Sequence, residues 1–171
     1  MRKVDNMKRN ETCCFTGHRK LPKEQYAEIE KVLENMITEL IEKGVRYFGV
    51  GGALGFDTMA ALTVLKLKER YPHIKLILVL PCKNQTAKWQ QKDIDVYEYI
   101  KSKCDKYVYT SQYYYNGCMQ KRNKHLVDNS GYCICYLTNG NSGTAFTVNY
   151  AKKNNVVIYN IFEETNKYNV Q

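Results

Sequence analysis

The sequence predicts an α/β protein of three layers, in which helices cover both faces of a mostly parallel sheet of about six strands. Short apolar segments alternate with segments of helical periodicity along the chain. The segment IKLILVLP at 74–81 is apolar over nearly its whole length, which is typical of a central strand buried on both faces. The loops that follow the strands carry most of the glycines. In a parallel sheet such loops meet at the carboxyl edge, where ligands bind.

The first two elements have clear boundaries. TCCFTG, near residues 12–17, is a short buried strand that ends in glycine. The next segment has the i, i+3, i+4, i+7 apolar spacing of an amphipathic helix. Pro22 suits the first helical turn, and Gly44 suits a stop after the last turn. The apolar stripe of this helix consists of Ile29, Val32, Leu33, Met36, Ile37, Leu40 and Ile41.

The remaining elements repeat this alternation. A second helix begins after the glycine-rich loop and ends before Tyr71-Pro72, since a residue before proline disfavours helix. We interpret residues 1–171 as one domain, with residues 1–10 and 163–171 as loose tails. Further strands are expected at 45–50, 74–81, 106–110, 132–137 and 156–161, and further helices around 93–103, within 113–130 and at 145–155.

Composition narrows the class of protein and of partner. Hydrophobic residues make up 44% of the 171 residues, as in ordinary globular domains. No apolar run approaches the roughly 18 residues that span a bilayer, and the N-terminus has no apolar signal region. We therefore expect a cytoplasmic protein without a membrane partner. The formal net charge of +9 favours anionic partners, from phosphorylated small molecules to nucleic acid.

The seven cysteines include no CxxC pair. Cys13-Cys14 and Cys133-Ile-Cys135 lie inside predicted strands, so we interpret them as buried, reduced thiols. The three histidines show no spacing that pairs with these thiols, and we expect no metal site.

The stretch FGVGGALGFDTMAA, residues 48–61, places four glycines within seven residues and then begins a helix. It matches neither the GxGxxG fingerprint nor the GxxxxGK[ST] phosphate loop. Glycines here permit either a tight strand-to-helix turn or a close approach of backbone N–H groups to phosphate or ribose. Asp57 follows, and its carboxylate serves either the helix start or a ribose hydroxyl.

A second glycine-bearing loop, NGNSGT at 139–144, also precedes a predicted helix. Gly143 and Thr144 would offer backbone donors and a hydroxyl group to a phosphate at that helix start. Two such loops in one small α/β domain favour an anion site over a purely structural role.

Other polar and aromatic residues fall near the same edge of the sheet. Arg19, beside His18, can form bidentate contacts with phosphate or can cap the sheet edge. Arg122 lies in a predicted helix close to these loops. Trp89, the only tryptophan, either stacks on a base or closes the core. The run Tyr113-Tyr114-Tyr115, among lysines, would also suit stacking with single-stranded nucleic acid.

Five segments, taken in order, resemble one known family. They are CCFTGHR, GGALGFDTMAA, PCKNQTAKW, YYYNGCMQKRNKHLVD and SGTAFTVNYA. Together, from about Cys13 to Ile161, they are similar to the YpsA-like branch of the SLOG superfamily. The resemblance implies a Rossmann-like fold and a homo-oligomer. That superfamily includes the LOG phosphoribohydrolases, the DNA-processing protein DprA, and sensor domains for nucleotide-derived ligands such as relatives of NAD or ADP-ribose.

The LOG enzymes offer an informative comparison. Their Met-His-x-Arg-Lys segment resembles Met119 to Asn123, which keeps the arginine. Their Pro-Gly-Gly-x-Gly-Thr-x-x-Glu motif resembles Asn139 to Thr147, but Thr147 stands in place of the acid. A threonine neither stabilises positive charge on a ribose nor activates water. The chain thus resembles the enzymes in the parts that hold a nucleotide and lacks their part for cleaving one.

We therefore expect a domain that binds a nucleotide-derived small molecule: ADP-ribose, an NAD-like molecule or a cyclic nucleotide signal. It would be a sensor, a carrier or a sequestering protein, for instance a phage anti-defence sponge. Two alternatives stay open: an N-glycosidic or phosphoribosyl hydrolase using Asp57 or Asp128, and a DprA-like binder of single-stranded nucleic acid. We expect no catalytic residue, no metal ion and no cofactor. The expected ligand-binding residues are Gly17, His18, Arg19, Gly51, Gly52, Ala53, Gly55, Asp57, Trp89, Arg122, Asn123, Gly140, Ser142, Gly143 and Thr144.

Overall fold

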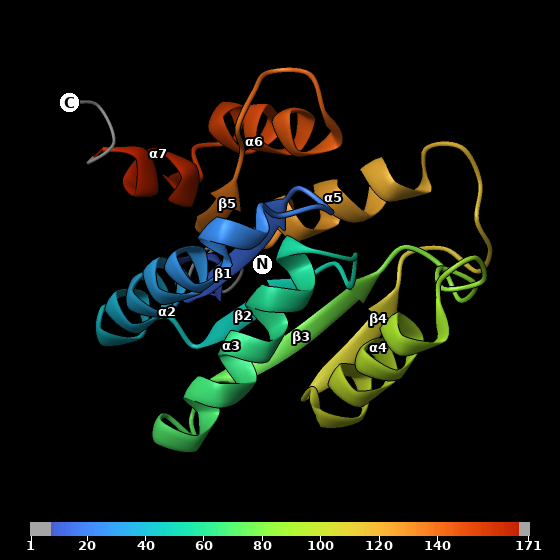
Figure 1. The fold of residues 1–171 in the computed structure, drawn as a ribbon, viewed down its shortest axis with the longest axis horizontal. Helices are drawn as coiled ribbons and strands as arrows, with labels where there is room; N and C mark the ends of the chain where they lie inside the picture. Colours follow the sequence, from blue (N-terminus) through green and yellow to red (C-terminus); the bar gives the residue numbers. More distant parts are fainter. Residues whose placement is uncertain (1–7, 168–171) are drawn as a thin grey trace.

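The computed structural model describes residues 8–167 and contains one six-stranded sheet (Figure 1). The strand order is β4-β3-β2-β1-β5-β6, and every neighbouring pair is parallel. The α/β class and the six expected strands are therefore confirmed. The strands are β1 (Thr12–Gly17), β2 (Tyr47–Val50), β3 (Lys75–Leu80), β4 (Lys106–Tyr109), β5 (Tyr132–Tyr136) and β6 (Val157–Asn160).

Helices cover both faces of this sheet. The core on one face is formed with α2, α3, α4 and α7, and the core on the other face with α5 and α6. This arrangement follows from right-handed crossovers that first run outward from β1 to β4 and then return through α5 to β5. The helices are η1 (Lys23–Gln25), α2 (Tyr26–Glu42), α3 (Phe56–Arg70), α4 (Gln91–Lys103), α5 (Cys118–Asp128), α6 (Gly143–Lys153) and α7 (Ile161–Asn166).

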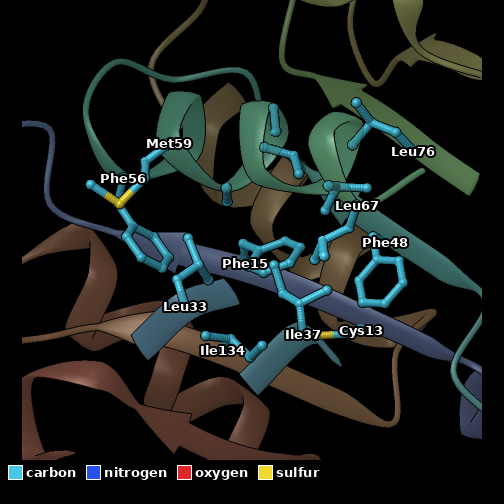
Figure 2. Packing of buried hydrophobic residues seen from close by; sticks show 14 of the residues in the cluster. Cys13, Phe15, Leu33, Ile37, Phe48, Phe56, Met59, Leu67, Leu76 and Ile134 are labelled. Atoms are coloured by element: carbon cyan, nitrogen blue, oxygen red, sulfur yellow. The ribbon is translucent and has the colours of Figure 1, made fainter. Parts of the chain in front are cut away.

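The larger core cluster lies between the sheet and the α2–α3 layer (Figure 2). Phe15 of β1 and Phe48 of β2 stack at 6.2 Å between ring centroids, and Leu33 and Ile37 of α2 are fully buried. The stripe predicted for α2 is thus its buried face, although Val32 and Met36 are only half-buried at its margin.

Several boundaries differ from the sequence-based expectation. Pro22 does not lie in the first turn of the long helix: it precedes the short 3₁₀ turn η1, and α2 begins at Tyr26. Gly44, with φ +100°, follows the C-cap of α2, as expected of a glycine stop. Residues 163–166, expected to be a loose tail, belong to α7, because Ile161 and Thr165 bury their side chains against the core. Residues 1–7 and 168–171 of the expected tails lie outside the described part of the chain.

The seven cysteines are free thiols, and all but the half-buried Cys104 are buried. Burial raises the pKa of Cys135 to about 12, which keeps this thiol protonated and unreactive at neutral pH. Within residues 8–167, no group of three or more His, Cys, Asp or Glu side chains is arranged to hold a metal ion. Among the same residues, no helix has the length and apolar character needed to cross a bilayer.

Candidate functional site

A cavity of about 260 Å³ opens beyond the carboxyl end of β1. Since all six strands are parallel, the loops after β1, β2 and β5 reach this edge together. The lining also includes the start of α5. The residues around the cavity are Phe15, Thr16, Gly17, His18, Arg19, Ala53, Asp57, Met119, Arg122, Asn123, Ser142, Gly143 and Thr144.

The glycines after β2 let two backbone segments pack closely. Gly55 has φ +77°, and a Cβ at this position would lie 2.3 Å from the carbonyl oxygen of Arg19. The amide of the next residue, Phe56, donates to the carbonyl of His18 at 3.1 Å. The loop after β2 therefore packs against the loop after β1 and supports it. Gly55 is needed for this tight turn and does not line the cavity.

Arg122 of α5 is buried between the same loops, with only 5% of its surface exposed. Its Nη1 donates to the carbonyl of Gly51, and its Nε donates to Oδ1 of Asn123 at 2.7 Å. A Cβ on Gly51 would lie 2.5 Å from that Nη1, so a side chain at this position would displace the guanidinium. Arg122 thus ties α5 to the glycine-rich loop while it also lines the cavity.

Asp57 is the one carboxylate that lines this cavity among the described residues. Its Oδ2 accepts from the amide of Ala53 at 3.1 Å, so it stabilises the loop before α3. Burial raises the pKa of Asp57, while the positive charge of Arg122 and the Ala53 amide act in the opposite direction. Burial likewise lowers the pKa of Arg122, and the charge of Asp57 opposes that change. The two buried charges therefore compensate each other.

The N-terminus of α6 faces the cavity. The Oγ of Ser142, the N-cap, accepts from the amide of Ala145 at 3.1 Å, and the amide of Phe146 donates to the carbonyl of Ser142 at 3.0 Å. Within the described chain, this leaves the amides of Gly143 and Thr144 for another acceptor. A Cβ on Gly143 would meet nothing within 4 Å, so this glycine leaves the helix start open.

His18 and Arg19 form the wall after β1. The amide of Thr138 donates to Nε2 of His18 at 3.1 Å, so Nε2 is an acceptor and Nδ1 carries the proton. Burial lowers the pKa of His18, which keeps the ring neutral at pH 7. Arg19 is exposed beside it, and its charge reaches both Asp57 and Arg122. The cation of this wall is therefore the exposed Arg19.

The cavity brings together many of the expected residues, but not all. Gly51 and Gly52 lie behind the wall, against Arg122 and Leu80 respectively. Trp89 packs edge-to-face on Tyr97, 5.6 Å between ring centroids, and lies half-buried against the core. The expected residues in the lining are Gly17, His18, Arg19, Ala53, Asp57, Arg122, Asn123, Ser142, Gly143 and Thr144; those outside it are Gly51, Gly52, Gly55, Trp89 and Gly140.

Sequence reasoning missed three lining residues, Phe15, Thr16 and Met119. Nothing in the sequence distinguishes Phe15 and Thr16 from other residues of a buried strand. Met119 begins the segment that resembles the LOG motif, and that likeness would have pointed to it.

Of the positions considered for hydrolysis, Thr147 and Asp128 lie outside the cavity lining, whereas Asp57 lies in it. The hydroxyl of Thr147 donates to the carbonyl of Gly143 at 2.9 Å inside α6. Asp128 is the last residue of α5 and accepts from the Tyr150 hydroxyl at 2.7 Å. It lies five residues beyond Asn123, the nearest lining residue of α5, which is about 8 Å along the helix axis. Within residues 8–167, Asp57 is thus the carboxylate that the lining offers to a ligand.

The exposed tyrosines lie on a different loop. Tyr113, Tyr114 and Tyr115 are 71%, 61% and 46% exposed. The amide of Tyr114 donates to Oδ1 of Asn84 at 3.0 Å, which ties this loop to the one after β3. They form an aromatic surface beside the carboxyl edge, separate from the cavity.

Comparisons with known proteins agree with this architecture. The YpsA family model, described as the YspA SLOG family, matches residues 9–166. A UPF0398 protein of Brevibacillus brevis is 32% identical over 149 residues, which cover 85% of this chain and 79% of that protein. The SPbeta prophage-derived protein YoqJ of Bacillus subtilis is 34% identical over 131 residues, which cover 69% of this chain and 77% of YoqJ.

Two solved structures of DNA processing protein A share the fold. The protein from Helicobacter pylori, which binds single-stranded DNA, has a TM-score of 0.64 at 18% identity, covering 91% of this chain and 66% of that chain. The protein from Streptococcus pneumoniae has a TM-score of 0.64 at 17% identity, covering 86% of this chain and 48% of that chain. This chain therefore spans two thirds or less of these structures, and at such identities the likeness shows the Rossmann-like fold alone.

Proposed function

The chain belongs to the YpsA SLOG family, and from this premise we propose that its cavity binds the phosphate-bearing part of a nucleotide-derived small molecule. The observation that carries the proposal is the convergence of Arg19, the open start of α6 and the opposite buried charges of Asp57 and Arg122 around one cavity. Arginine and free backbone amides bind phosphate, and the carboxylate of Asp57 suits a ribose hydroxyl.

The cavity volume agrees with a ligand part that consists of one phosphate and its ribose. About 260 Å³ is just below the usual range of ligand pockets, roughly 300–1,000 Å³, and suits a phosphate with its sugar rather than a whole dinucleotide. The rest of a larger ligand would extend toward solvent past His18 and Ser142, which also line a neighbouring hollow of about 530 Å³.

We assign the domain a binding role, as a sensor, carrier or sequestering protein. Asp57 is already engaged by a backbone amide and influenced by the positive charge of the buried Arg122, which makes it a weak candidate for a general base. The relative encoded by a B. subtilis prophage supports a phage function such as sequestration of a defence signal.

Replacing Arg19 with alanine is expected to weaken binding of AMP or ADP-ribose about 10- to 100-fold, because one charge-assisted contact with phosphate is lost. Isothermal titration calorimetry at fixed salt measures this change. Lys23→Ala, an exposed residue of η1 outside the cavity lining, is the matched control and should bind like the unmodified protein. Equal affinities of Arg19→Ala and the unmodified protein for every nucleotide tested would remove the proposal.

A second candidate, binding of single-stranded nucleic acid, is favoured by the exposed tyrosines and the net charge of +9. The Helicobacter protein of the same fold binds single-stranded DNA. This function would use Tyr113 and Tyr114 as stacking platforms and would depend steeply on salt.

On this second candidate, Tyr113→Ala combined with Tyr114→Ala should cost about 1–3 kcal/mol per stacked base in binding a short oligo(dT). Fluorescence anisotropy at low salt measures the change. Tyr26→Ala, an exposed tyrosine of α2, serves as the control. If the unmodified protein does not bind oligo(dT) even at low salt, this candidate fails.

A further inference from the structure

The face of the sheet that carries α5 and α6 is covered over only part of its width. Three of the five crossovers place their helices, α2, α3 and α4, on the opposite face. On the α5 side, α6 packs on β1, β5 and β6, and α5 packs on β3. Beside α5, over β2, β3 and the edge strand β4 of Figure 1, a groove of about 660 Å³ remains.

The floor of this groove is apolar. Ile77 and Val79 of β3 and Val108 of β4 belong to the smaller core cluster on the α5 side, yet Ile77 and Val108 are only half-buried. The sequence predicts that β3 is buried on both faces. The structure confirms this fully for Leu76, Leu78 and Leu80 on the α3 side, but leaves the α5 side partly open.

The rim of the groove is basic. Lys8, Lys106 and Lys121 line it and are exposed, and His125 lies one turn after Lys121 on α5. No Asp or Glu lines the groove, and within residues 8–167 no carboxylate lies within ion-pair distance of these three lysines. The positive charges are spread along the rim, so they match an extended anionic partner rather than a single anion.

The dimensions of the groove match one helix. Strands in a sheet are about 4.8 Å apart, so β4 lies roughly 10 Å from β2. Packed helices lie about 8–10 Å apart, so one further helix would fit beside α5 over β3 and β4. It would complete the covering layer that the apolar pattern of β3 requires.

We propose that this groove binds an amphipathic helix of another protein, with an apolar stripe on Ile77, Val79 and Val108 and acidic residues opposite the lysines. A second copy of the chain is disfavoured because its net charge is +9 and the groove is itself basic. Residues 1–7, which precede Lys8, carry Arg2 and Lys3 against the single acid Asp5, so this segment is net basic and does not complement the basic rim.

The test is a selection of 14-residue helical peptides with randomised apolar and charged positions on the full-length protein. Enriched peptides should carry apolar residues at i, i+3 or i+4, and i+7, flanked by Asp or Glu. Val108→Glu should weaken their binding about tenfold or more. Lys106→Glu with Lys121→Glu, on the exposed rim, should weaken it too and should favour peptides with Lys flanks.

Lys103→Glu, an exposed residue of α4 on the other face, is the control and should leave binding unchanged. Circular dichroism shows whether Val108→Glu folds. If it does not fold, the test rests on peptide binding by the exposed double variant Lys106→Glu with Lys121→Glu. The proposal would be overturned if no peptide is enriched, or if the enriched peptides are basic or lack the apolar pattern. It would also be overturned if the groove variants bind the enriched peptides as tightly as the unmodified protein does. A concentration-dependent dimer that the double variant dissociates would assign the groove to a second copy instead, and tighter binding after removal of residues 1–7 would assign it to that segment.

Discussion

Replacing Arg122 with methionine is expected to lower the free energy of unfolding by about 3–5 kcal/mol at pH 7.5. The buried Asp57 carboxylate would lose its compensating charge, and the Gly51 carbonyl would lose its donor. Urea unfolding followed by circular dichroism measures the change. Lys121→Met, an exposed residue of the same helix, is the control and should stay within about 0.5 kcal/mol of the unmodified protein.

The loss should also depend on pH. Burial holds the pKa of Asp57 above its unfolded value, so the stability that its protonation contributes is present at low pH and is lost as pH rises through the folded pKa. Without the positive charge of Arg122, the pKa of Asp57 in the folded protein rises further. The folded protein then continues to lose stability up to a higher pH. Arg122→Met should therefore be more destabilised at pH 7.5 than at pH 5. Adding Asp57→Asn should remove this pH dependence, and an identical loss at both pH values in the single variant would contradict the electrostatic coupling of Asp57 and Arg122.

Gly55→Ala is expected to destabilise the protein by about 2–5 kcal/mol and to weaken ligand binding as well. Its φ of +77° strains any side chain, and the added Cβ would collide with the backbone of Arg19. Thermal or urea unfolding, together with calorimetry, measures both effects.

Gly140→Ala is a matched control for Gly55→Ala in the other glycine-bearing loop. Nothing lies within 4 Å of a Cβ at Gly140, and its φ is not in the left-handed region. The stability should change by no more than about 0.5 kcal/mol. Equal effects of the two substitutions would mean that the loop after β2 does not support Arg19.

The order of elements follows from local pattern, and this is why it could be predicted. The spacing of Leu33, Ile37 and Leu40 specifies a helix with one buried face, and the continuous run of β3 specifies a central strand. By contrast, the short α7 has no such stripe. Its helical state depends on Ile161 and Thr165 packing against distant elements, so the sequence alone predicts a loose tail there.

The site was predictable as a set of loops but not as a set of contacts. The glycines after β2 and the basic residue Arg122 both stand out in the sequence, yet their partnership crosses 71 positions of the chain. Only the structure shows that Gly51 makes room for the guanidinium rather than for a ligand. Trp89 could be assigned to the core only once its packing on Tyr97 was known.

The central claim is that a phosphate-bearing ligand binds at the start of α6 beside Arg19. Titration of ¹⁵N-labelled protein with AMP and ADP-ribose, followed by ¹H–¹⁵N correlation spectra, tests it most directly. The largest shifts should appear at the amides of Gly143 and Thr144 and at the Arg19 side chain, and should disappear in Arg19→Ala. Shifts confined to Tyr113–Tyr115, or no shifts with any nucleotide, would contradict the claim.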